Sequence, residues 1–121
     1  MQTSDVVMTR HDGLVDIKLN RAAAGNILSA AMGSAIIAAL ETLDDEVRLV
    51  RLRASGPNFC TGRESPMPAG GTIVSAEALR RLVAGPVLAL YDALKQSRVP
   101  VLAVVRGQAI GRAARWPLCA I

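Results

Sequence analysis

Two apolar strands, each preceded by a helical segment and followed by a glycine-containing loop, limit this chain to a small set of folds. Residues 47–54 and 101–105 are the two strands, and the loops that follow them span residues 59–64 and 106–111. Successive helix–strand units favour parallel strands joined by right-handed crossovers onto one sheet. The pattern therefore predicts an α/β fold.

A β-hairpin is predicted at the start of the chain. Residues 6–10 and 14–19 read as strands, and Asp12-Gly13 between them is a strong short-range hairpin signal. In the second strand apolar residues alternate with Asp16 and Lys18, which predicts one buried and one wet face.

Two helices are predicted, each capped by a serine. Ser29 precedes apolar residues at helical spacing, which are Met32, Ile36, Leu40 and Leu43. Ser75 precedes the helical segment 76–84, and Gly85-Pro86 is predicted to break or kink that helix. The predicted order is hairpin, helix, strand, helix, strand.

The strand at residues 47–54 is predicted to be buried on both faces. Leu49 and Val50 adjoin each other in it. Such a run is typical of a parallel strand with helices on both sides of the sheet.

Composition excludes several classes of protein. The chain has 121 residues, so it forms one domain at most, and its 51% apolar content argues against a disordered segment. Aromatic residues make up only 2%, which leaves little for stacking on nucleic-acid bases. The net charge of +4 comes from scattered arginines. It indicates either a solvated surface or attraction for a phosphate-bearing ligand.

Cysteine and histidine usage predicts neither a metal site nor a disulfide framework. Cys60 and Cys119 stand far apart in unlike contexts, and the only histidine, His11, is expected at the surface of the hairpin turn. We also expect no signal peptide and no membrane span, which by default favours a cytoplasmic protein without membrane or nucleic-acid partners.

The two loops that follow the parallel strands are the candidate site. Backbone N–H groups fixed at the rim of a sheet can hold an oxygen that gains negative charge during a reaction. Because each loop can supply one such donor, the pattern is consistent with a two-donor oxyanion hole.

Four motifs follow one another in a fixed order. They are Leu-Asn-Arg with Gly-Asn-Ile-Leu-Ser in residues 19–29, Asp-Glu-Val-Arg-Leu-Val at 45–50, Phe-Cys-Thr-Gly-Arg-Glu at 59–64, and Val-Pro-Val-Leu-Ala-Val-Val-Arg-Gly-Gln-Ala-Ile-Gly at 99–111. In these motifs the chain resembles the enoyl-CoA hydratase/isomerase family, also called the crotonase family.

The resemblance implies that residues 5–111 form the N-terminal portion of a crotonase-like (ClpP/crotonase) fold. It also implies acyl-CoA thioesters as substrates, with CoA as part of the substrate and no separate cofactor. The thioester oxygen would become enolate-like between two backbone amides, the first being the N–H of Thr61. Full-length members of the family assemble as homo-oligomers.

The resemblance further implies a set of substrate-binding residues. These are Arg21, Ala24, Asn26, Thr61, Gly62, Arg63, Glu64 and Gly111. Arg21 is either a contact to the phosphate or adenine side of CoA or a solvated arginine. Glu64 stands where the family has Asp, and we expect it to be structural.

Residues 112–121 depart from the family pattern. Arg112 falls where the second oxyanion amide is expected, Arg115 falls near the first catalytic Glu, and Pro117 would weaken the following helix. The codons for residues 115–121, read one base earlier, can encode Ala-Leu-Ala-Ala-Leu-Cys-Asp, which is similar to the family's own segment. We therefore hypothesise a frameshift after Gly111 and an inactive, truncated hydratase or isomerase. The alternative is a non-catalytic CoA-binding fragment or a pseudogene product.

Overall fold

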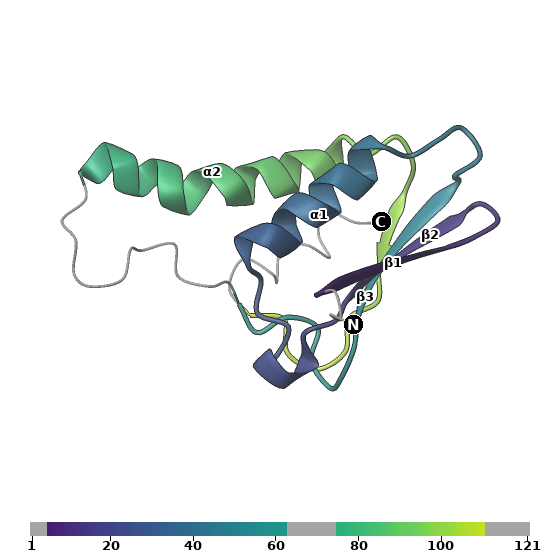
Figure 1. The fold of residues 1–121 in the computed structure, drawn as a ribbon, viewed down its shortest axis with the longest axis horizontal. Coiled ribbons are helices and arrows are strands. Elements are labelled where there is room, and N and C mark those ends of the chain that lie inside the picture. The colour runs from purple at the N-terminus through teal and green to yellow at the C-terminus, as the bar shows by residue number, and fades with distance from the viewer. Residues whose placement is uncertain (1–4, 63–74, 111–121) are drawn as a thin grey trace.

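The structure is a computed structural model, and it describes residues 5–62 and 75–110. Its elements follow the predicted order of hairpin, helix, strand, helix and strand (Figure 1). They are β1 (Val6–His11), β2 (Leu14–Leu19), the short 3-10 helix η1 (Ala22–Ala24), α1 (Ala30–Glu41), β3 (Leu49–Ala54), α2 (Ala76–Lys95) and β4 (Val101–Ala103). The predicted α/β class is confirmed.

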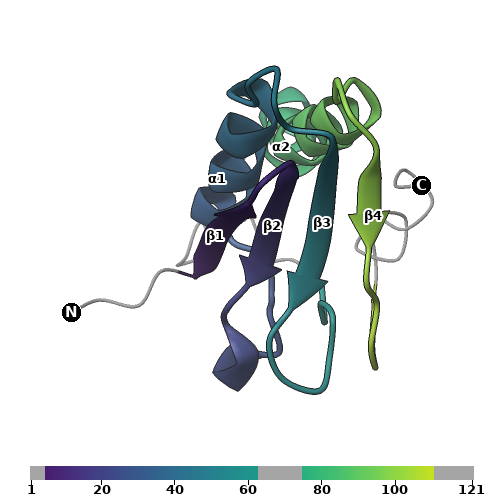
Figure 2. The ribbon, with the colours of Figure 1, turned by 90° about the vertical axis from the view of Figure 1, so that its right-hand side faces the viewer.

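One four-stranded sheet, in the order β1-β2-β3-β4, organises the fold. The hairpin pair β1–β2 is antiparallel, whereas β2–β3 and β3–β4 are parallel. Asp12 takes a left-handed conformation, with φ of 51°, in the two-residue turn between the strands. Figure 2 shows both helices behind the same face of the sheet. Because β2, β3 and β4 run parallel, their carboxyl ends meet at one edge of the sheet.

Helix α1 begins where the sequence predicts. The Ser29 hydroxyl accepts a hydrogen bond of 3.2 Å from the Met32 amide, so the cap satisfies one of the free amides of the first turn. The buried residues of α1 are Met32, Ile36 and Leu40, one turn apart. Leu43 lies beyond the end of the helix and is half-buried against the core.

Helix α2 runs through Gly85-Pro86 without a break, so the predicted break is wrong, whereas a kink there stays a prediction. A proline inside a helix loses one backbone hydrogen bond and costs roughly 3 kcal/mol. Burial of Leu90, Tyr91 and Leu94 beside α1 offsets such a cost, because packing of an apolar face stabilises a helix more than propensity does.

Strand β3 is buried on one face only within the described residues, which corrects the prediction of burial on both. Val50 and Leu52 are wholly buried on the helix side. Arg51 and Arg53, on the other face, keep 36% and 40% of their side-chain surface. Adjacent apolar residues predicted two buried faces, but Leu49 at the strand end is only half-buried.

Candidate functional site

The candidate site lies at the carboxyl edge of the parallel strands. The loops after β2, β3 and β4 span residues 20–28, 55–62 and 104–110, and they gather at the foot of the sheet in Figure 2. In open α/β sheets this edge is where ligands bind, because the loops there diverge and can be varied without disturbing the sheet. Hydrogen bonds between the three loops hold the candidate site together.

The loops after β3 and β4 lie side by side, as the sequence predicts. Cys60 and Ala109 form an isolated parallel bridge. The Cys60 amide donates to the Gln108 carbonyl, and the Ile110 amide donates to the Cys60 carbonyl, each at 3.0 Å. These bonds fix the spacing of the two loops that were predicted to provide oxyanion donors.

Asn58 also joins these two loops, and it was not predicted from the sequence as a site residue. Its Oδ1 accepts a hydrogen bond of 3.0 Å from the Gln108 amide. Gly107 makes this approach possible, since a Cβ there would lie 2.1 Å from the Pro57 carbonyl oxygen and its φ is +63°. The signal available in advance was only Gly56-Pro57-Asn58, a run of turn-forming residues.

Asn26 ties the loop after β2 to the loop after β3. It is 1% exposed and adopts a φ of 56°. Its Oδ1 accepts from the Arg21 amide at 2.8 Å, and its Nδ2 donates to the carbonyls of Ser55 and Asn58 at 2.8 and 2.9 Å. The structure therefore corrects its assignment as a substrate contact, because the buried amide uses both of its hydrogens within the protein.

The Thr61 amide is not free, and this corrects the prediction that it is the first oxyanion donor. It donates a hydrogen bond of 3.0 Å to the carbonyl oxygen of Gly25. A backbone amide has one hydrogen, so an amide bonded in this way cannot also hold a substrate oxygen. Residue 61 thus supports the loop in place of contacting a ligand through its N–H.

Gly62 offers the next amide along the loop. Its N–H makes no hydrogen bond to any other residue in the described segments, and its carbonyl accepts from the Leu28 amide at 2.9 Å. A Cβ at Gly62 would meet open space, and its φ of +133° is a conformation that favours glycine. Arg63, Glu64 and Gly111 lie outside the described residues.

Arg21 and Ala24 belong to the loop after β2. Arg21 is half-buried, and its Nη1 donates to the Ile27 carbonyl at 3.3 Å. Ala24 is exposed in η1. The guanidinium is thus held by its own loop, which disfavours the fully solvated alternative, and its contact with CoA stays a prediction.

The three loops contain no acid or histidine within the described residues. Their titratable or charged side chains are those of Arg21, Cys60 and Arg106. Burial raises the pKa of the Cys60 thiol, which is 0% exposed and lies 3.1 Å from the Gly62 carbonyl, so it stays protonated. The described part of the site therefore contains no carboxylate or imidazole that could serve as a general acid or base.

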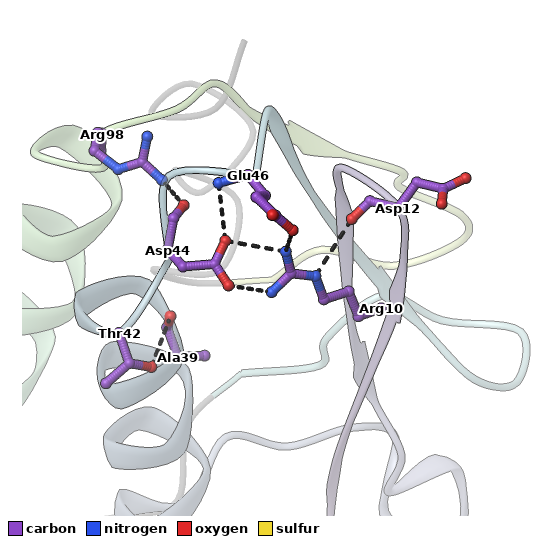
Figure 3. Close-up of polar contacts among 7 residues, drawn as sticks. All are labelled: Arg10, Asp12, Ala39, Thr42, Asp44, Glu46 and Arg98. Atoms are coloured by element: carbon purple, nitrogen blue, oxygen red, sulfur yellow. Dashed lines mark hydrogen bonds and ion pairs between the residues drawn. The ribbon is translucent and has the colours of Figure 1, made fainter.

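An ion-pair network occupies the opposite edge of the sheet (Figure 3). Arg10 binds the Asp44 carboxylate through both terminal nitrogens and lies 3.6 Å from a Glu46 oxygen. Arg98 donates to the Asp44 carbonyl. The pairing lowers the pKa of Asp44 and raises that of Arg10 through their mutual hydrogen bonds. The network thus joins β1 to the α1–β3 and α2–β4 connections, and its charged groups pair with one another.

No three histidine, cysteine, aspartate or glutamate side chains in the described segments are placed to hold a metal ion. No described helix is long and apolar enough to cross a membrane.

Residues 9–120 match the sequence model of a family described as enoyl-CoA hydratase/isomerase. The chain belongs to that family. The match confirms the resemblance drawn from the four motifs, and it includes residues 112–120. That segment lies outside the described residues, so its origin by frameshift stays a prediction.

Relatives of the enoyl-CoA hydratase/isomerase family share both sequence and fold. A probable enoyl-CoA hydratase of Rhodobacter capsulatus is 33% identical over 109 residues, which are 90% of this chain and 41% of that protein. An enoyl-CoA hydratase structure from Mycobacterium smegmatis has 32% identity and a TM-score of 0.85, with 98% of this chain and 46% of that one covered.

A third relative was solved with a ligand. This Thermobifida fusca protein, provisionally assigned as an enoyl-CoA hydratase, is in complex with CoA. It has 25% identity and a TM-score of 0.79, over 96% of this chain and 47% of that one. The chain therefore spans less than half the length of the relatives it matches, and it has the fold of their corresponding part.

Proposed function

We propose that this protein binds acyl-CoA thioesters at the carboxyl edge of β2, β3 and β4. The observation that carries the proposal is the bridge between Cys60 and Ala109, which holds two glycine-containing loops together at the sheet edge. Family membership supports the substrate class, and the CoA complex of the Thermobifida fusca relative is consistent with it.

The thioester oxygen is proposed to be held by the amide of Gly62. Thr61 uses its amide on Gly25, whereas the Gly62 amide has no partner in the described segments. An oxygen that gains charge as the thioester becomes enolate-like is stabilised by a donor that is already fixed in place. The family's second oxyanion amide corresponds to Arg112, which lies outside the described residues, so the proposal rests on the Gly62 donor alone.

The chain on its own is proposed to bind without turnover. Hydration or isomerisation needs a group that gives and takes a proton, and the described parts of the three loops contain no aspartate, glutamate or histidine. The family's hydratase or isomerase activity would then need acids from beyond these loops. CoA enters as part of the substrate, with no separate cofactor.

Calorimetric titration of the purified chain with crotonyl-CoA tests binding, and loss of the unsaturated thioester absorbance tests turnover. We expect saturable binding and no hydration above the rate without protein. Turnover would contradict the non-catalytic assignment, and absence of binding would contradict the substrate class. Gly62→Ala should weaken binding, because an added Cβ disfavours the φ of +133°. Gly33→Ala, in α1 with open space around its Cβ, is the matched control and should bind like the wild type.

A further inference from the structure

The face of the sheet turned away from the helices carries a group of charged side chains. Ile17, Leu19, Val50 and Leu52 are buried toward the helices, so the residues between them point to the other face. The charged residues on that other face of β2 and β3 are Asp16, Lys18, Arg51 and Arg53. Figure 2 shows this face without a covering helix in the described part of the chain.

Asp16 holds the two arginines in place. Its Oδ1 accepts from Arg51 Nε and its Oδ2 from Arg53 Nε, each at 2.7 Å. The carboxylate is 2% exposed, whereas the Arg51 and Arg53 side chains are 36% and 40% exposed. The two guanidiniums are thus anchored from beneath by a buried acid.

The terminal nitrogens of both guanidiniums are unbonded in the part of the chain that the structure describes. Within residues 5–62 and 75–110, every hydrogen bond of Arg51 and Arg53 to the carboxylate uses Nε, and their terminal nitrogens make none. Arginine presents these donors in a planar fork that matches the oxygens of a phosphate. Anchoring in advance reduces the conformational entropy that a ligand would otherwise have to overcome.

The net charge of these four side chains favours a ligand with two negative charges over one with a single negative charge. Lys18 lies in register with Arg53, so three cations share the face with one carboxylate. Asp16 neutralises one of them and leaves a local charge of about +2. A single carboxylate would leave one positive charge unmatched, whereas a phosphomonoester carries a charge of about −1.5 to −2 at neutral pH.

We propose that Arg51 and Arg53, both anchored by Asp16, form with Lys18 a binding site for a phosphomonoester group on the face of the sheet turned away from the helices. This site is separate from the loops that carry the proposed thioester site, so either proposal can fail without the other. Two sources of the group fit the chemistry, namely free phosphate and the phosphomonoester of CoA.

Titration of the full chain with inorganic phosphate at constant ionic strength, followed by amide NMR shifts, tests the proposal. We expect shifts in β2 and β3 and a loss of affinity of about tenfold or more in Arg51→Lys/Arg53→Lys, which keeps the charge and removes the forks. Arg80→Lys, on the exposed side of α2, is the matched control and should leave binding unchanged. Absence of binding, or equal binding by the double variant, would overturn the proposal.

Asp16→Asn distinguishes two explanations of phosphate binding, namely a site with anchored arginines and a surface that is only positively charged. The substitution adds one positive charge and removes the carboxylate that holds both guanidiniums. An anchored site predicts weaker phosphate binding, and tighter binding would overturn the proposal. The spectrum of each variant also reports whether it is folded, and the lysine double variant provides the test if Asp16→Asn does not fold.

Comparison of CoA with dephospho-CoA identifies the source of the phosphate. If CoA supplies it, CoA binds more tightly, and the difference disappears in Arg51→Lys/Arg53→Lys. If CoA and dephospho-CoA bind alike while inorganic phosphate still shifts β2 and β3, the site holds a different phosphomonoester. Either result supports the site, whereas a CoA preference that persists in the double variant would overturn it.

Discussion

The backbone N–H of Thr61 donates a hydrogen bond of 3.0 Å to the carbonyl oxygen of Gly25. The bond joins the loop after β2 to the loop after β3. The left-handed conformation of Gly25 allows this approach, since a Cβ there would lie 2.6 Å from Thr61 Oγ1. Residue 61 therefore supports the site, and the next amide, that of Gly62, makes no hydrogen bond to another described residue.

This contact predicts a non-additive pair of substitutions. Gly25→Ala should lower the free energy of unfolding by about 2 kcal/mol, because alanine is strained at φ of +66° and collides with the Thr61 side chain. Thr61→Ala removes the two closest atoms and should recover about 1 kcal/mol of that loss in the double variant. Urea unfolding measures each variant, and strictly additive changes would contradict the contact.

Gly33→Ala is the control for this pair. A Cβ at residue 33 meets nothing within 4 Å, and the residue lies inside α1. Alanine there should raise the free energy of unfolding by about 0.5–1 kcal/mol, since it restricts the unfolded chain and favours helix.

We predict that Asn26 stabilises the fold and does not contact the ligand. Asn26→Ala leaves the Arg21 amide and the carbonyls of Ser55 and Asn58 without their partner, which should cost about 2–4 kcal/mol. Gln108→Ala keeps every backbone bond of its loop and should change stability by less than about 0.5 kcal/mol. Equal unfolding midpoints in urea for the two variants would refute this role.

Asp16 predicts a pH dependence of stability. Desolvation acts to raise its pKa, but the hydrogen bonds from Arg51 and Arg53 together outweigh it, so the pKa is lowered. The stabilisation is therefore complete above the unfolded pKa of about 4, and it is lost as the pH falls toward the folded value. Asp16→Asn should cost about 1–3 kcal/mol at neutral pH.

Urea midpoints measured across this pH range check the sign. The difference between wild type and Asp16→Asn should shrink below about pH 4, whereas Asp45→Asn, an exposed acid, should follow the wild type. A difference that stays constant from neutral to acid pH would argue against the buried ion pair.

Cys60 is predicted to be an unreactive thiol. It is 0% exposed and burial raises its pKa, so little thiolate forms at neutral pH. In a Cys119→Ser background, modification by a thiol reagent should be slow in buffer and become fast in denaturing urea. Rapid modification of the folded protein would show that the loop is open at Cys60.

Local signals in the sequence were enough to predict most of the fold. Strand β2 occupies the predicted residues, and Ser29 and Ser75 cap their helices because capping depends only on the first turn. The continuity of α2 through Pro86 could not be predicted in this way, since it depends on packing against a distant segment.

The sequence predicted which loops form the site, but it indicated the wrong backbone amide, that of Thr61, as the free donor. The adjacency of the loops after β3 and β4 follows from parallel topology, which the helix–strand alternation indicates. Which amide of the loop is free depends on the carbonyl of Gly25, a residue 36 positions away from Thr61 that no local pattern connects to it. For the same reason Asn26 could be taken for a ligand contact.

The amide signals of residues 61 and 62 test the central claim most directly. In the free protein the Thr61 amide should be protected from hydrogen exchange and the Gly62 amide should not. On titration with crotonyl-CoA, the Gly62 proton should move downfield as it bonds the thioester oxygen, and the Thr61 proton should stay in place. A ligand-induced shift at Thr61 with Gly62 unchanged would contradict the account.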